Sequence, residues 1–139
     1  MDFPKQLIPI IITMAWQTII HYFLHLIFPF AIAWVFFRNN WKKAGLIMFL
    51  TILVDIDHVF ANPVFDPMRC SINFHPLHSY WAIGIYFAGL FYQKTRWIAI
   101  GLIVHMSADL LDCFLMYRNC LECHTNSVLH DLAITPGFT

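Results

Sequence analysis

The sequence is poor in charged residues, and this scarcity limits the classes of protein that it can encode. Among 139 residues there are eight basic and eight acidic side chains, so that 12% are charged, whereas 60% are hydrophobic. Soluble domains carry about 25% charged residues, which cover a fold surrounded by water. The balance of basic and acidic side chains also gives no basic surface for nucleic acid. We therefore expect an integral membrane protein that contacts lipids and does not bind nucleic acid.

The chain also lacks internal repeats, low-complexity tracts and an A-x-A-like cleavage site after its first apolar run. Without a cleavage site, we expect the first apolar run to be retained rather than removed as a signal peptide. A length of 139 residues suits one domain. The prediction is a single membrane domain over residues 1–139.

Long apolar stretches divide this domain into predicted transmembrane helices. A spanning helix needs about 20 apolar residues, and the first apolar run is longer, so we separate a lead-in from the helix that follows. Pro29 should kink this first helix, because proline removes a backbone hydrogen bond. The predicted fold class is all-α, an integral membrane four-helix bundle with a structured outer loop. The helices are expected at residues 18–37, 44–60, 79–92 and 97–117, with the outer loop at 61–78 and an outer tail at 118–139.

The basic residues predict which helix ends face the cytoplasm. The two short loops between helices hold five lysines and arginines, and the rest of the chain holds three. Cytoplasmic loops carry the excess of basic residues in membrane proteins. We therefore expect a multi-pass protein whose short loops are cytoplasmic, and whose N-terminus, long loop and tail face outward.

Four aspartates lie in the predicted helices, and no lysine or arginine lies with them. A charged side chain at the bilayer centre costs about 2.5–3.5 kcal/mol, so these carboxylates require a compensating group. Four histidines lie in the same helices and two more in the outer loop. Imidazoles and carboxylates are ligands for zinc and similar divalent metals. The sequence therefore predicts a metal centre with ten candidate ligands, namely His21, His25, Asp55, Asp57, His58, His75, His78, His105, Asp109 and Asp112.

Residue spacing gathers these ligands on common helix faces at the outer end of the bundle. His21 and His25 are four residues apart, as are His105 and Asp109, so each pair shares a face. Ten candidates exceed the needs of one zinc ion. Either two or more ions bind, or some of these residues hold the ligating imidazoles in place.

Five motifs resemble those of a group of short, uncharacterised bacterial membrane proteins, and the resemblance covers about residues 21–123. They are His-Tyr-x-x-His at 21–25, Asp-x-Asp-His at 55–58, Asn-Pro-x-x-Asp-Pro-x-Arg-Cys at 62–70, Phe-His-Pro-Leu-His at 74–78 and His-Met-x-x-Asp-x-x-Asp-Cys at 105–113. This resemblance implies a location in the bacterial inner membrane.

A looser similarity links the chain to the bacterial inner-membrane metal-dependent hydrolase family regulated by the LexA repressor. That family has Pro-Asp-x-Asp, His-Arg-Gly-x-x-His-Ser and His-x-x-x-Asp, after a histidine in the first helix. Here Val54 replaces the proline, and Pro76 and Leu77 stand where the family has Arg-Gly. The missing arginine is a natural phosphate clamp, so the substrate need not be shared.

The hydrolase similarity implies metal-assisted hydrolysis, and the outward site suggests a lipid or isoprenoid phosphoester as substrate. The metal, zinc by its ligand set, would activate water and neutralise developing charge. A spare aspartate, Asp57 or Asp112, would act as general base. The favoured direct ligands are Asp55, His58, His78, His105 and Asp109. His21 or His25, and Asp57 or Asp112, would complete the set.

Two rival classes would use the same ligands. A transport or sensing protein would bind a metal or protons along a pathway, but only Thr51 and Ser107 stand out as polar groups in the cytoplasmic half. A non-catalytic accessory protein stapled by metal would bind a membrane partner and show no activity when purified. A polar network without metal is the simplest alternative.

Four cysteines, Cys70, Cys113, Cys120 and Cys123, lie at or near the predicted outer face, which is oxidising. They allow two disulfides in three pairings. A bond from Cys70 to Cys113 or to the tail would hold the long loop over the site, and a thiolate metal site in the tail is another interpretation. The tail also matches the c-type haem attachment pattern, Cys-x-x-Cys-His, but the shortness of the match and of the tail disfavours haem.

Overall fold

The computed structural model describes residues 3–62 and 69–119, and within these ranges every regular element is a helix. The all-α class is therefore confirmed for the described part of the chain. The α-helices are α1 (Phe3–Leu26), α2 (Phe28–Phe36), α3 (Trp41–Phe49), α4 (Tyr80–Gly89) and α5 (Arg96–Asn119), and the 3₁₀ helices are η1 (Arg38–Asn40), η2 (Leu50–Phe60) and η3 (Pro76–His78).

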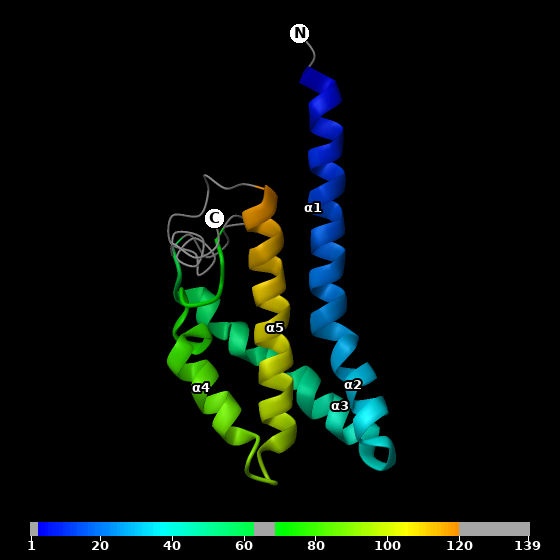
Figure 1. The fold of residues 1–139 in the computed structure, drawn as a ribbon, viewed down its shortest axis with the longest axis vertical. Helices are drawn as coiled ribbons and strands as arrows, with labels where there is room; N and C mark the ends of the chain where they lie inside the picture. The colour runs from blue at the N-terminus through cyan, green and yellow to red at the C-terminus, as the bar shows by residue number, and fades with distance from the viewer. Residues whose placement is uncertain (1–2, 63–68, 120–139) are drawn as a thin grey trace, which may run out of the picture.

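Helix α5 is the central element, since it contacts α1, α3, α4 and η2 (Figure 1). Helices α1 and α5 run side by side, and α2 and α3 pack together as a short helical hairpin at the lower end of the view. The turn that joins α4 to α5 lies at this same end. In this arrangement α1, η2 and η3 lie around the middle of α5.

The first predicted helix, at 18–37, is divided in the structure. Helix α1 ends at Leu26, α2 begins at Phe28, and their axes are bent by 41°. Pro29 lies in the first turn of α2, where its missing N–H needs no partner within the helix. Proline thus starts a new helix instead of bending a continuous one. The predicted lead-in is helical as well and belongs to α1.

The second predicted helix, at 44–60, changes from α to 3₁₀ geometry at its middle. A 3₁₀ helix has three residues per turn, so residues three apart share one face. Thr51, Val54 and Asp57 are accordingly all buried. At the transition the Thr51 hydroxyl donates to the carbonyl of Met48, at 2.6 Å. The 3₁₀ geometry thus places Asp57 on the buried face of η2.

The last two helices differ from the prediction mainly at their ends. Helix α4 ends at Gly89, three residues before the predicted 92, and turns follow it. At its start the Ser79 hydroxyl accepts a hydrogen bond from the N–H of Ala82, at 3.3 Å, as an N-cap. Helix α5 includes the whole predicted range 97–117.

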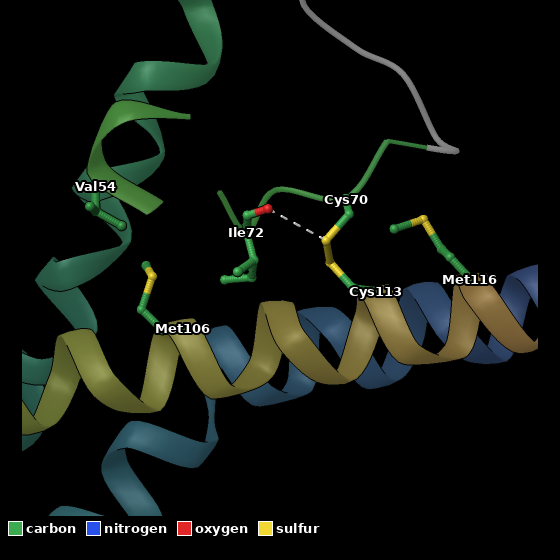
Figure 2. Close-up of a cluster of buried hydrophobic side chains, with 6 residues drawn as sticks. All are labelled: Val54, Cys70, Ile72, Met106, Cys113 and Met116. Atoms are coloured by element: carbon green, nitrogen blue, oxygen red, sulfur yellow. Dashed lines mark hydrogen bonds between the residues drawn. A yellow bond between two sulfur atoms is a disulfide. The ribbon is translucent and has the colours of Figure 1, made fainter. Parts of the chain in front are cut away.

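A disulfide between Cys70 and Cys113 joins the loop before η3 to α5. It is one of the pairings that the sequence left open. The bond lies within the apolar cluster drawn in Figure 2, so it anchors the loop inside the core. The remaining cysteines, Cys120 and Cys123, and the haem-type pattern lie outside the described residues. The cluster consists of Val54, Cys70, Ile72, Met106, Cys113 and Met116.

Many large apolar side chains lie on the outside of the molecule. In α5, Arg96–Tyr117 is long and apolar enough to cross a membrane, and the bent α1–α2 pair qualifies too if it counts as a single span. Exposed apolar residues occur on every α-helix, and soluble monomers rarely expose large continuous apolar surfaces. Examples are Trp16, Phe36, Leu46, Trp81, Ile85 and Ile98.

Gly101 marks the closest approach of α5 to the α3–η2 junction. A Cβ atom there would lie 2.8 Å from Met48 Cα and from Thr51 Cγ2. Overpacking of this kind costs about 1–3 kcal/mol, so Gly101→Ala is expected to lower the free energy of unfolding, measured by denaturation in detergent. Gly84→Ala is the matched control, because a Cβ at Gly84 meets nothing within 4 Å. Equal destabilisation by both substitutions would contradict the close approach.

Candidate metal centre

All ten predicted ligands lie in the described residues, and the structure brings them together from four segments. His21 and His25 come from α1, three residues from η2, His78 from η3 with His75 just before it, and three from α5. Ligand atoms within 4.8 Å of one another form three groups: Asp55, His78, His105 and Asp109; His21, His25 and Asp109; and Asp57, His58 and His75.

The first group, Asp55, His78, His105 and Asp109, has the spacing of a coordination shell. His78 Nε2 lies 3.3 Å from Asp55 Oδ1 and 3.1 Å from Asp109 Oδ2. His105 Nε2 lies 3.0 Å from Asp55 Oδ1 and 3.4 Å from Asp109 Oδ2. Atoms about 2.0–2.1 Å from a tetrahedral ion are separated from each other by about 3.3 Å. The four side chains therefore fit a divalent metal ion.

Two of these atoms are buried and make no hydrogen bond. His78 Nε2 and Asp109 Oδ2 approach to 3.1 Å, yet neither has a hydrogen-bond partner. Both residues are almost inaccessible, with His78 0% and Asp109 4% exposed. Buried polar atoms without partners are rare and costly. A cation between them would satisfy both, so this pair is the strongest local indication of a metal.

Asp57 holds the ring of His78 in place. Asp57 Oδ2 lies 3.1 Å from His78 Nδ1 and accepts the N–H of Leu77 at 2.9 Å. With its Nδ1–H donated to Asp57, His78 directs its other ring nitrogen, Nε2, at Asp55 and Asp109. Carboxylates commonly orient ligating imidazoles in this way. Asp57, expected as a ligand or base, is placed behind His78, and both of its oxygens are engaged.

The loop before η3 sets the position of His75 and His78. Asn73 has a φ of 61°, in the left-handed region that asparagine tolerates. Its N–H donates to the carbonyl of His78 at 2.9 Å. The Cys70–Cys113 disulfide anchors the start of this loop. The loop therefore carries its histidines to the middle of α5 with a fixed geometry.

Carboxylates control the pKa of His78. Burial alone would lower this pKa, but Asp109, Asp55 and Asp57 surround the ring and raise it to about 10. A divalent ion that binds Nε2 at neutral pH must therefore displace a proton.

The second group, His21, His25 and Asp109, lies on the α1 side of the same aspartate. His25 Nε2 lies 3.2 Å from Asp109 Oδ1, the oxygen that faces away from His78. Nearby, Gln17 donates to Asp112 Oδ1 at 2.9 Å, and Asp112 Oδ2 lies 3.7 Å from His21 Nδ1. Asp112 thus borders the second group and is partly exposed.

The third group, Asp57, His58 and His75, adjoins the first. His58 Nδ1 lies 3.1 Å from Asp57 Oδ1 and 3.7 Å from Asp55 Oδ1. Its Nε2 lies 3.2 Å from the hydroxyl of Ser71. Although His58 was favoured as a direct ligand, the structure places it beside the four-residue group and in contact with its supporting carboxylate.

His75 stacks on His58, with ring centroids 3.9 Å apart. Burial, and next the proximity of His58, lower the pKa of His75 to about 4, so its ring is neutral at physiological pH. Sequence reasoning missed Ser71, which partners His58, because no spacing relates it to the histidines. Ser71 follows Cys70 directly, and the Cys70–Cys113 disulfide anchors the loop in which Ser71 contacts His58.

A family model matches residues 14–116, a range that contains all ten candidate ligands. It describes a family of unknown function (DUF6122). The chain belongs to this family. This is consistent with the resemblance to an uncharacterised family, whereas the comparisons give no support to the similarity with the LexA-regulated hydrolases. No curated protein and no solved structure matches the chain.

Proposed function

We propose that this member of the DUF6122 family is a metal-dependent hydrolase of the bacterial inner membrane that cleaves a lipid or isoprenoid phosphoester at the outer membrane surface. The observation that carries the proposal is the group Asp55, His78, His105 and Asp109, with two buried atoms that have no hydrogen-bond partner. The Asp-x-Asp and His-x-x-x-Asp motifs, similar to those of the LexA-regulated hydrolases, point to hydrolysis.

A multi-pass arrangement is supported by the exposed apolar surface and by element lengths. Residues 41–60 extend over about 35 Å at 1.5 Å per α and 2.0 Å per 3₁₀ residue, which suffices to cross. Helix α4 extends over only about 15 Å. It starts, however, next to His78, which already lies beside His105 in the middle of α5. Helix α4 needs to cross only the remaining, cytoplasmic half.

The loop 69–79 would then lie at membrane depth, buried in protein, where irregular backbone is tolerated. Such a placement keeps the site in a medium of low dielectric, next to the outer surface. An amphiphilic substrate could present its phosphate there while its chain stays in lipid.

The residues of the site would have different chemical roles. A bound divalent metal ion would polarise a phosphoryl oxygen and lower the pKa of water. Asp55, His78, His105 and Asp109 would hold it, and Asp57 would keep the His78 ring oriented. Asp112 is the better placed general base, because it is partly exposed and, among the described residues, only its Oδ1 accepts a hydrogen bond, from Gln17, whereas both oxygens of Asp57 are engaged.

The test is phosphate release by detergent-purified protein loaded with zinc or manganese. Phosphatidic acid and an isoprenoid diphosphate are suitable substrates. We expect metal-dependent release by the wild type and a loss of at least 100-fold in His105→Ala, with Gly84→Ala as an active control. Metal-loaded wild type without activity would contradict the hydrolase and favour the accessory or transport class. Equal phosphate release by the wild type and by His105→Ala would mean that a contaminating phosphatase, and not this protein, produces the activity.

A further inference from the structure

We propose that Asp109 bridges two metal ions, and that the second ion is held by His21, His25 and Asp109 Oδ1. This inference extends the metal centre of the proposed function. It rests on buried atoms of α1 that the four-residue group does not use. Two ions would also balance four ionised aspartates.

The state of the His25 ring is set by the backbone. Its Nδ1 lies 3.0 Å from the carbonyl oxygen of His21. A carbonyl can only accept, so Nδ1 carries a proton. In the neutral ring, Nε2 then carries a lone pair, and histidine binds metals through such an unprotonated nitrogen.

The Nε2 atom of His25 lies close to a carboxylate. His25 Nε2 lies 3.2 Å from Asp109 Oδ1, and the side chains are 2% and 4% exposed. Despite the short distance, Nε2 has no hydrogen-bond partner. A second proton on the ring would therefore not point at the carboxylate oxygen. A cation that both atoms face removes the repulsion between them.

His21 supplies a third ligand from the preceding turn of α1. Its ring stacks on that of His25, with centroids 4.3 Å apart. His21 Nδ1 is likewise buried without a hydrogen bond. The ligand atoms of His21, His25 and Asp109 lie within 4.8 Å of one another. Three protein ligands and an open position are typical of catalytic rather than structural zinc sites.

The two sites share one carboxylate. Asp109 directs Oδ2 toward His78 and His105, and Oδ1 toward His25. The rings of His25 and His105 are also in edge contact, with centroids 4.3 Å apart. Paired ions can stabilise both the attacking and the leaving oxygens of a phosphoryl displacement. The arrangement is therefore compatible with the phosphoester substrate of the proposed function.

The experiment is a Mn²⁺ titration of metal-depleted protein in detergent, followed by electron paramagnetic resonance. We expect two ions per wild-type chain with an exchange-coupled spectrum. His25→Gln should keep one ion with an uncoupled six-line spectrum, since glutamine can still donate to the His21 carbonyl. Ser107→Ala, an exposed position on α5, is the control and should keep two. His21→Ala provides a second variant at the same site.

One uncoupled ion in both wild type and His25→Gln would overturn the bridged pair. Two coupled ions in His25→Gln would also overturn it, by placing the second ion elsewhere. The outcome is separable from that of the proposed function. A coupled pair without phosphate release refutes the hydrolase alone, and hydrolysis with a single ion refutes the bridge alone.

Discussion

Asp109→Asn is expected to cause the largest loss of metal affinity of any single substitution in this protein. Asp109 contacts His25 through one oxygen and both His78 and His105 through the other. The amide has no charge and offers one oxygen, so the two sides of the centre cannot both keep an oxygen ligand from this residue, and neither keeps a carboxylate. The loss should exceed the roughly 10–100-fold that removal of an orienting partner costs. Metal content and competition with a chromophoric chelator measure it.

Asp57→Asn is the matched control for this substitution, because Asp57 is as buried as Asp109 but lies behind His78. We expect it to weaken binding within the smaller range, about 10–100-fold. Equal losses in the two variants would mean that Asp109 is a supporting residue and not a ligand. Unchanged affinity in Asp109→Asn would refute its role at the centre.

Metal affinity is expected to rise steeply with pH. Three carboxylates raise the pKa of His78 to about 10, so below this pH a proton occupies the site that the metal needs. Each proton displaced makes the apparent affinity change about tenfold per pH unit. Affinity should therefore fall at least tenfold from pH 8 to pH 7, and again to pH 6. His75, with a pKa of about 4, should release no proton in this range.

Calorimetric titration with zinc in two buffers of different ionisation enthalpy counts the released protons. We expect at least one per chain for the wild type. Asp57→Asn removes one of the carboxylates that raise the pKa of His78, so affinity should stop rising at a lower pH than in the wild type. Affinity independent of pH between 6 and 8 would contradict direct binding to His78.

The helical class and the grouping of ligands could be predicted from sequence because both depend on local periodicity. Apolar runs define the helices, and the four-residue spacing of His105 and Asp109 places both on one face of α5. Pro29 predicts a kink within one helix, and the structure instead has two helices that meet at a bend just before it.

Other features depend on contacts between distant segments, which periodicity cannot report. Residues 50–60 have no composition that distinguishes 3₁₀ from α geometry, and the α5 contact at Gly101 helps to fix the neighbouring backbone. That geometry turns Asp57 inward to His78. The pairing of Cys70 with Cys113, and the contact of Ser71 with His58, likewise required the folded loop.

The most direct test of the metal centre is the metal content of protein purified in detergent without chelators, measured by elemental mass spectrometry. The comparison is the His78→Ala/His105→Ala double variant, with Gly84→Ala as a folding control. We predict at least one equivalent of zinc, manganese or iron per wild-type chain, kept in the control and lost in the double variant. A wild type without stoichiometric metal would contradict the centre and leave a polar network of histidines and aspartates.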